Sequence, residues 1–182
     1  FCDMKKFKVF NTNNIWINLV ALNNRLKKDF LELSVLVNRK NIKGAPILQL
    51  ETAIGSGFEC FDGAVGLSVS RERFLPVKTT DDLLLVQSNL FTLNKGTLIR
   101  SPQRNSNTLP AIKLGDFLRN IENFKRSFPV IPDLLDLEDL KIEGAVRFEG
   151  TSSLKGKVCL KGLKKPLSLP SGVVIADETR QA

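Results

Sequence analysis

Apolar and polar positions alternate with two different periods along the N-terminal two thirds of the chain. Residues 7–10 alternate with the period of two that is typical of a strand, and residues 15–26 place apolar side chains at helical spacing. The apolar run at residues 31–37 predicts a buried strand, residues 47–50 predict a second short strand, and the polar segment 38–44 predicts a loop between them. Strands that alternate with helices predict an α/β architecture.

Three further segments predict helices. Residues 51–61 have one apolar face, but Gly55 and Gly57 inside this segment are unfavourable in a helix unless a neighbour packs closely against them. Residues 81–91 and 116–128 predict the other two helices, and both carry apolar residues at helical spacing.

From Ile142 onward the period changes to six. Glycine recurs at positions 144, 150, 156 and 162, and a large apolar residue stands two positions ahead of each glycine: Ile142, Phe148, Leu154 and Leu160. This pattern is typical of a hexapeptide β-helix, in which the apolar residue points into the coil and glycine permits a tight corner. A meander of short hairpins is the alternative. Four units are too few to stand alone, so we expect them to dock on the α/β part or on another copy.

Composition narrows the possible chemistry. The chain has no histidine, which excludes Ser-His-Asp and Cys-His catalysis. Its net charge of +8 favours an anionic partner such as phosphate or nucleotide. Nucleic acid is not expected as a partner, because the lysines are scattered and no stacking aromatics run among them. The widely spaced Cys2, Cys60 and Cys159 suit the reduced thiols of a cytoplasmic protein, and no apolar run has the length of a membrane span.

The first candidate site is the segment that leads into the helix at residues 81–91. Pro76 stiffens it, and Lys78 stands where the helix is expected to begin. Thr79 and Asp82 are three residues apart, which predicts a capping box with aspartate in place of the usual glutamate. A helix N-terminus beside an ammonium group is suited to hold phosphate. An ordinary capped helix with a solvated lysine in front of it is the alternative.

The second candidate site is the asparagine cluster at residues 11–14, between the first strand and the first helix. A strand that passes through a polar turn into a helix is where open α/β sheets bind ligands. Helix capping alone is the alternative for this cluster.

Four blocks stand in a fixed order along the chain: FKVFNTNNIW at residues 7–16, LQLETA at 48–53, RFLPVKTT with DLLLV at 73–86, and IPD at 131–133, ahead of the six-residue repeat. In this combination the chain resembles the C-terminal half of the eukaryotic-type UTP–glucose-1-phosphate uridylyltransferases, the UDP-glucose pyrophosphorylase family. The resemblance covers essentially the whole chain.

The resemblance implies a partial glycosyltransferase-A-like α/β nucleotidyltransferase domain over residues 1–132 and a short left-handed β-helix over residues 133–182. It implies a reaction of UTP with glucose 1-phosphate that gives UDP-glucose and pyrophosphate, with Mg²⁺ as cofactor and metal ligands outside this chain. Lys78 matches the family's catalytic lysine, which meets the nucleotide phosphates. Asn13 matches the asparagine that contacts the sugar nucleotide.

The chain also departs from the family pattern. The family's glycine-rich pyrophosphate-binding loop and its acidic magnesium-contacting positions have no counterpart in these residues. We therefore expect a fragment or a shortened product without uridylyltransferase activity of its own, which exposes core surface and a sheet edge. A noncatalytic module that forms a homo-oligomer through the β-helix is the second hypothesis, and a basic nucleic-acid-binding domain is the third.

Overall fold

The fold was analysed in a computed structural model, which describes residues 6, 9 and 11–182. Apart from Val9, the strand expected over residues 7–10 lies outside the described residues. The chain divides into two compact units, Phe1–Val69 and Ser70–Ala182, and each unit is described by itself. None of the helices formed by the described residues combines the length and hydropathy needed to cross a membrane.

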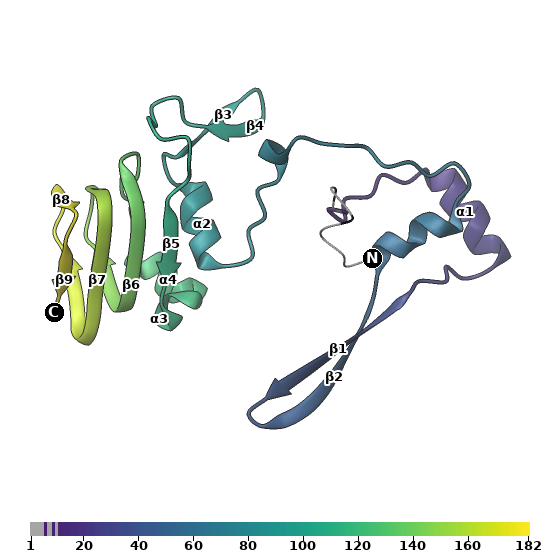
Figure 1. The fold of residues 1–182 in the computed structure, drawn as a ribbon, viewed down its shortest axis with the longest axis horizontal. Helices are drawn as coiled ribbons and strands as arrows, with labels where there is room; N and C mark the ends of the chain where they lie inside the picture. The colour runs from purple at the N-terminus through teal and green to yellow at the C-terminus, as the bar shows by residue number, and fades with distance from the viewer. Residues whose placement is uncertain (1–5, 7–8, 10) are drawn as a thin grey trace. The chain divides into compact units, whose positions relative to one another are not determined.

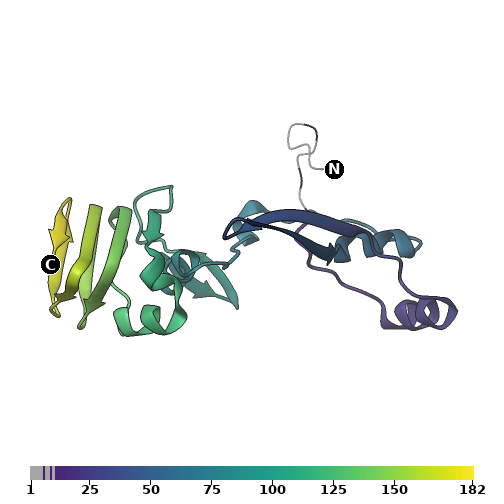
Figure 2. The same ribbon diagram turned by 90° about the horizontal axis from the view of Figure 1, so that it is seen from below.

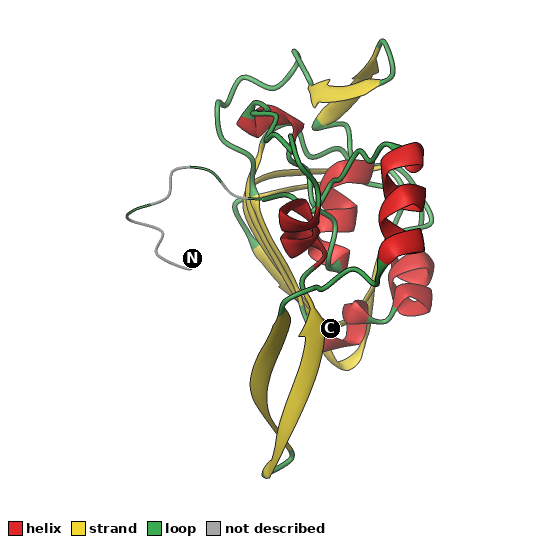
Figure 3. Cartoon of the chain, turned by 90° about the vertical axis from the view of Figure 1, so that its right-hand side faces the viewer, coloured by secondary structure: helices red, strands yellow, loops and turns green. Residues whose placement is uncertain are grey.

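The first unit contains helix α1 (Leu19–Lys28) and the antiparallel strands β1 (Val35–Ile42) and β2 (Ala45–Thr52). The predicted loop at residues 38–44 is wrong, because the strand continues to Ile42. Lys43 and Gly44 form a two-residue turn with φ angles of 52° and 87°. Positive φ at both central residues is the geometry that joins two strands directly. Figure 3 shows the hairpin as a twisted two-stranded ribbon.

Many apolar side chains of the first unit are exposed to solvent, and its other described apolar side chains are at most half-buried. None of its described residues is buried, and Val35 and Val37 are 60% and 55% exposed. The prediction of a buried strand over residues 31–37 is therefore wrong. The physical reason is that an isolated two-stranded hairpin has no third strand or helix to cover either face.

The segment after β2 is the 3-10 helix η1 (Ile54–Cys60), where the sequence predicted an α-helix over residues 51–61. Glycine costs backbone entropy in an α-helix, and the tighter 3-10 form is used in short pieces of this kind. Ser56 anchors η1 to the start of β1, because its Oγ accepts a hydrogen bond from the Ser34 backbone N–H at 2.8 Å.

The second unit begins with short elements that precede its sheet. They are η2 (Arg71–Arg73), α2 (Thr80–Gln87), the hairpin β3 (Phe91–Asn94) and β4 (Thr97–Arg100), β5 (Ala111–Leu114), α3 (Asp116–Arg119) and α4 (Ile121–Ser127). The single helix expected over residues 116–128 is interrupted at Asn120. The Asn120 carboxamide oxygen accepts hydrogen bonds from two N–H groups of α4 and so starts a new helix there.

The five-stranded sheet of the second unit is parallel throughout. It contains β6 (Leu137–Phe148), β7 (Ser152–Leu169), β8 (Val173–Ala176) and β9 (Thr179–Gln181), with β5 beside β6. Figures 1 and 2 show β6, β7 and β8 in a row next to β5. Leu140 lies beside Val158 and Ile142 beside Leu160, so this part of β6 and β7 is paired at an offset of three six-residue units.

The six-residue pattern predicted the core of this sheet correctly. The four apolar residues expected to point inward, Ile142, Phe148, Leu154 and Leu160, are at most 1% exposed. Gly144 and Gly156 have φ angles of 78° and 60°, a conformation in which glycine avoids the strain of a side chain. Two of the four repeating glycines thus have the backbone conformation expected of a corner, and the β-helix itself stays a prediction.

The core of the second unit continues from the sheet to the preceding helices. Phe128, at the end of α4, stacks on Phe148 of β6 with ring centroids 5.1 Å apart. Buried side chains from both sides of the expected boundary at residues 132 and 133 belong to one hydrophobic cluster. The division into domains 1–132 and 133–182 differs from the two compact units and stays a prediction.

Candidate functional site

Lys78 directly precedes the capped start of α2. Asp82 N donates to Thr79 Oγ1 at 3.3 Å, and Thr79 N donates to Asp82 Oδ2 at 2.9 Å, which confirms the predicted capping box. The Lys78 backbone N–H donates to the same Asp82 oxygen at 3.0 Å. The pKa of Asp82 is lowered, first by this bond from Lys78 and then by the bond from the Thr79 side chain. The carboxylate thus fixes the backbone from which the Lys78 side chain extends.

The start of α2 carries charges of both signs. Asp81 and Asp82 lie in its first turn, where they oppose a bound anion. Both carboxylates already accept hydrogen bonds from the protein, since Asp81 Oδ1 accepts one from Leu114 N at 3.1 Å. The Lys78 side chain is exposed and forms no salt bridge with any residue that the structure describes. Its ammonium group is therefore available to an anionic ligand.

The asparagine cluster forms a turn that is closed by its own side chains. Asn13 has a φ of 57°, and its N–H donates to Asn11 Oδ1 at 2.8 Å. Asn14 Nδ2 donates to Thr12 Oγ1 at 3.1 Å. Helix α1 is capped by another residue, Asn18, whose Oδ1 accepts hydrogen bonds from the first N–H groups of the helix. Capping of α1 therefore does not explain the cluster at residues 11–14.

Gly55 of η1 packs against this turn. A Cβ at position 55 would overlap Asn11 Nδ2 and would lie 3.4 Å from Asn13 Oδ1. A Cβ at Gly57 would meet Leu33 Cδ2 at 3.4 Å. The close neighbour that the sequence required is thus present at Gly55, whereas the contact at Gly57 is an ordinary one, and the turn and η1 form one local site in the first unit. Asn13 and Lys78 belong to different units, and their meeting in one cavity stays a prediction.

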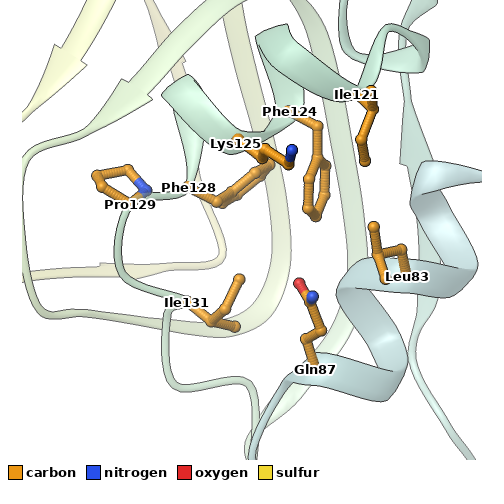
Figure 4. A pocket seen from close by; sticks show the side chains of 8 residues that line it. All are labelled: Leu83, Gln87, Ile121, Phe124, Lys125, Phe128, Pro129 and Ile131. Carbon is orange, nitrogen blue, oxygen red and sulfur yellow. The ribbon is translucent and has the colours of Figure 1, made fainter.

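Two surface pockets lie in the second unit, and Lys78 lines neither of them. The larger has a volume of about 560 Å³ between α2 and α4, and Figure 4 shows the apolar side chains of Leu83, Phe124 and Ile131 around it. Gln87 and Lys125 are its polar lining residues. The smaller, of about 260 Å³, includes Asn89, Asp133 and Ser152 among its lining residues. The larger pocket lacks the convergent polar groups that orient a ligand.

Sequence reasoning placed Asn11 in the asparagine cluster and expected a close neighbour at Gly55, but it gave no separate role to Asn11, Gly55 or Asp81. The spacing of Asn11 and Asn13 is that of an Asx-turn, so a local pattern could have identified this pair. The contact of Gly55 with Asn11 and the bond from Leu114 to Asp81 join distant segments. No local pattern predicts such contacts.

Comparison with known proteins gives a consistent match. A sequence model of the family described as UTP--glucose-1-phosphate uridylyltransferase matches residues 1–155. A curated relative of that name from Solanum tuberosum is 45% identical over 182 residues, which cover 98% of this chain and 38% of the relative. The relative from Hordeum vulgare is 42% identical over 181 residues, with coverages of 98% and 38%.

Solved structures resemble the chain in the same way. A mutant of the UDP-glucose pyrophosphorylase of Leishmania major matches with a TM-score of 0.78 and 27% identity, over 99% of this chain and 39% of that one. A Trypanosoma brucei protein described as a UDP-glucose phosphorylase matches with a TM-score of 0.73 and 34% identity, over 95% and 40%. The chain thus spans about two fifths of the length of the proteins it matches.

Proposed function

Because the chain belongs to the UTP–glucose-1-phosphate uridylyltransferase family, we propose that it carries part of a uridylyltransferase site. The proposed reaction joins UTP and glucose 1-phosphate to give UDP-glucose and pyrophosphate, as a nucleotidyltransferase of carbohydrate metabolism. The observation that carries this proposal is the exposed ammonium of Lys78 at the capped start of α2, within the residues that the family matches.

In the proposed mechanism an oxygen of glucose 1-phosphate attacks the α-phosphorus of UTP, and the bond to the leaving pyrophosphate breaks. Negative charge moves onto the pyrophosphate as that bond opens. Such a step depends on positioning and on charge neutralisation more than on proton transfer, which suits a chain without histidine. Lys78 would neutralise the phosphates, and the Asn13 carboxamide would bind the sugar nucleotide.

Helix α2 would support Lys78 in this role. The first N–H groups of a helix have no partner within the helix, and they add partial positive charge at its N-terminus. Because Asp82 accepts the backbone hydrogen bonds of Lys78 and Thr79, the cap would keep the lysine in a fixed place relative to these N–H groups.

Magnesium is proposed as the cofactor of the reaction, since divalent cations neutralise phosphate charge in phosphoryl transfer. Among the residues that the structure describes, no three His, Cys, Asp or Glu side chains are grouped to hold a metal ion. The two carboxylates next to Lys78 already accept protein hydrogen bonds. We propose that the ligands of the magnesium ion lie outside the residues of this chain.

The proposal includes the finer features of the family fold. Residues 1–132 would be part of a glycosyltransferase-A-like domain, and β6 to β9 would be coils of a left-handed β-helix. Parallel pairing at an offset of three six-residue units supports the coil. The proposal also includes a cytoplasmic location, which the free thiols of Cys60 and Cys159 support.

The proposed function is tested by calorimetric titration of the 182-residue chain with UDP-glucose. Removing a charge-assisted contact to phosphate costs about 1.5–3 kcal/mol, so Lys78→Ala should weaken binding roughly 10- to 100-fold. Lys164→Ala removes an equal charge from an exposed position and should leave the affinity unchanged. Equal affinities of the wild type and Lys78→Ala would refute the role of Lys78. Concentration-dependent self-association without any nucleotide binding would favour the noncatalytic oligomerisation module instead.

A further inference from the structure

Asn13 has an unfavourable backbone conformation that needs a stabilising contact. Its φ of 57° lies in the left-handed region, which asparagine adopts more readily than most residues but at a cost. The hydrogen bond from its N–H to Asn11 Oδ1, at 2.8 Å, closes an Asx-turn that stabilises this conformation. The direction of the Asn13 side chain therefore depends on the rotamer of Asn11.

Gly55 limits the rotamer of Asn11. A Cβ at position 55 would overlap Asn11 Nδ2 and would lie 3.6 Å from Asn11 Cγ. The backbone of Gly55 does not have a positive φ, so the position excludes larger residues by space alone. Asn11 could avoid such a Cβ only by turning its carboxamide, and this turn would take Oδ1 away from the Asn13 N–H.

Hydrogen bonds of the neighbouring residues fix the position of Gly55. The next residue, Ser56, donates its hydroxyl hydrogen to Ala53 O at 2.7 Å and accepts a hydrogen bond from Ser34 N at 2.8 Å. Ala53 N donates to Ser34 O at 2.9 Å. These three bonds tie the start of η1 to the start of β1. A clash at Gly55 would therefore be relieved on the side of Asn11.

We propose that Asn11 and Gly55 are positioning residues that direct the Asn13 carboxamide toward the sugar nucleotide. The inference rests on the proposed function, which assigns the ligand contact to Asn13, and it adds the two residues on which that contact depends. Asn11 acts through the N–H of Asn13. Gly55 acts by leaving the space that the Asn11 carboxamide occupies.

The test is an NMR measurement of the Asn13 amide in the ¹⁵N-labelled 182-residue chain. Loss of one hydrogen bond of about 1 kcal/mol should speed solvent exchange of this amide roughly fivefold in Asn11→Ala and in Gly55→Ala. The double variant should show no further change, because both substitutions break the same bond. Asn11→Asp keeps the acceptor oxygen and should keep the protection of the amide.

Gly57→Ala is the matched control in the same 3-10 helix, because its Cβ would meet only Leu33 Cδ2 at ordinary contact distance. It should leave the Asn13 amide unchanged. Additive effects of the two substitutions, or an equal effect of Gly57→Ala, would overturn the proposal.

Titration with UDP-glucose separates this inference from the proposed function. Asn11→Ala and Gly55→Ala should each weaken binding about fivefold, and together no more than either alone. Failure of the wild-type chain to bind UDP-glucose would refute the proposed function. The exchange rates of the Asn13 amide would still decide whether Asn11 and Gly55 hold its conformation.

Discussion

Thr79 and Asp82 hold each other at the start of α2, since the side chain of each residue accepts a hydrogen bond from the backbone N–H of the other. Asp82 Oδ2 also accepts the Lys78 N–H at 3.0 Å. One carboxylate oxygen therefore joins the helix cap to the residue that carries the candidate catalytic ammonium.

Removing the cap should destabilise the second unit. Thr79→Ala is expected to lower the free energy of unfolding by about 1 kcal/mol, the usual cost of losing an N-cap hydroxyl. Urea unfolding followed by far-ultraviolet circular dichroism measures this change. Thr79→Ser keeps the hydroxyl and is the control, which should remain close to the wild type. Equal losses in both variants would contradict the role of the hydroxyl.

The contribution of Asp82 should depend on pH. Its pKa is lowered in the folded chain, so the charged carboxylate stabilises the fold above the unfolded-state pKa of about 4. This stability is lost as the pH falls through the lower folded-state pKa. The difference in unfolding free energy between the wild type and Asp82→Asn should therefore shrink in acid. A difference that stays constant through the acid range would contradict the assignment.

Arg104 ties a loop to the start of β6. Its guanidinium donates to the carbonyl oxygens of Thr108, Leu135 and Leu137 at distances between 2.6 and 3.0 Å. Arg104→Ala would leave these carbonyls without their donor, at an expected cost of about 2–3 kcal/mol in urea unfolding. Arg104→Lys should recover little, because an ammonium does not reproduce the planar fork.

Arg119→Ala is the matched control for this experiment. Arg119 is exposed and pairs only with Asp116 of the same helix among the described residues, so its loss should cost no more than about 0.5 kcal/mol. A cost for Arg104→Ala as small as that of the control would show that the loop does not depend on the guanidinium.

Gly162 of β7 lies beside Gly144 of β6 in the parallel sheet. A Cβ at this position would overlap the carbonyl group of Ala145, and a backbone group cannot move away as a side chain can. Gly162→Ala should therefore cost about 3 kcal/mol in urea unfolding. Gly66→Ala, whose Cβ would enter open space, is the control and should be nearly neutral. A neutral Gly162→Ala would show that the sheet adjusts there at low cost.

The stacking of Phe128 on Phe148 tests the expected boundary at residue 132. Both side chains are buried, so Phe128→Ala should cost about 3–5 kcal/mol. Amide hydrogen exchange in β6 should accelerate in this variant, because one core spans the boundary. Phe117 is 43% exposed, and Phe117→Ala is the control. Unchanged exchange in β6 would instead support an independent domain after residue 132.

Local patterns predicted the cap of α2 and the interior of the parallel sheet. The capping box joins Thr79 and Asp82 within one helical turn, so their spacing reveals it. The six-residue period separates inward from outward positions, and the positions that it marked, such as Phe148 and Leu154, are buried. These features depend on residues that are near one another in the sequence.

Patterns failed where a contact partner lies far away along the chain. Strand β5 has only four residues and was not predicted, because it depends on parallel pairing of Leu114 with Ile142. Two of the carbonyls bound by Arg104, those of Leu135 and Leu137, belong to a segment about thirty residues later. The sequence predicted two short strands and a long loop where the hairpin of β1 and β2 lies. The polar side chains of β1 have the composition of a loop, because a two-stranded ribbon does not require an apolar face.

The amino-acid sequence by itself was sufficient to identify the family, to place a lysine before a helix and to predict the asparagine turn. Each of these results rests on short blocks of neighbouring residues. Folding in three dimensions established that Gly55 leaves space for Asn11 and that Phe128 joins the helices to the parallel strands. Steric exclusion and core packing act between surfaces that only the folded chain brings together.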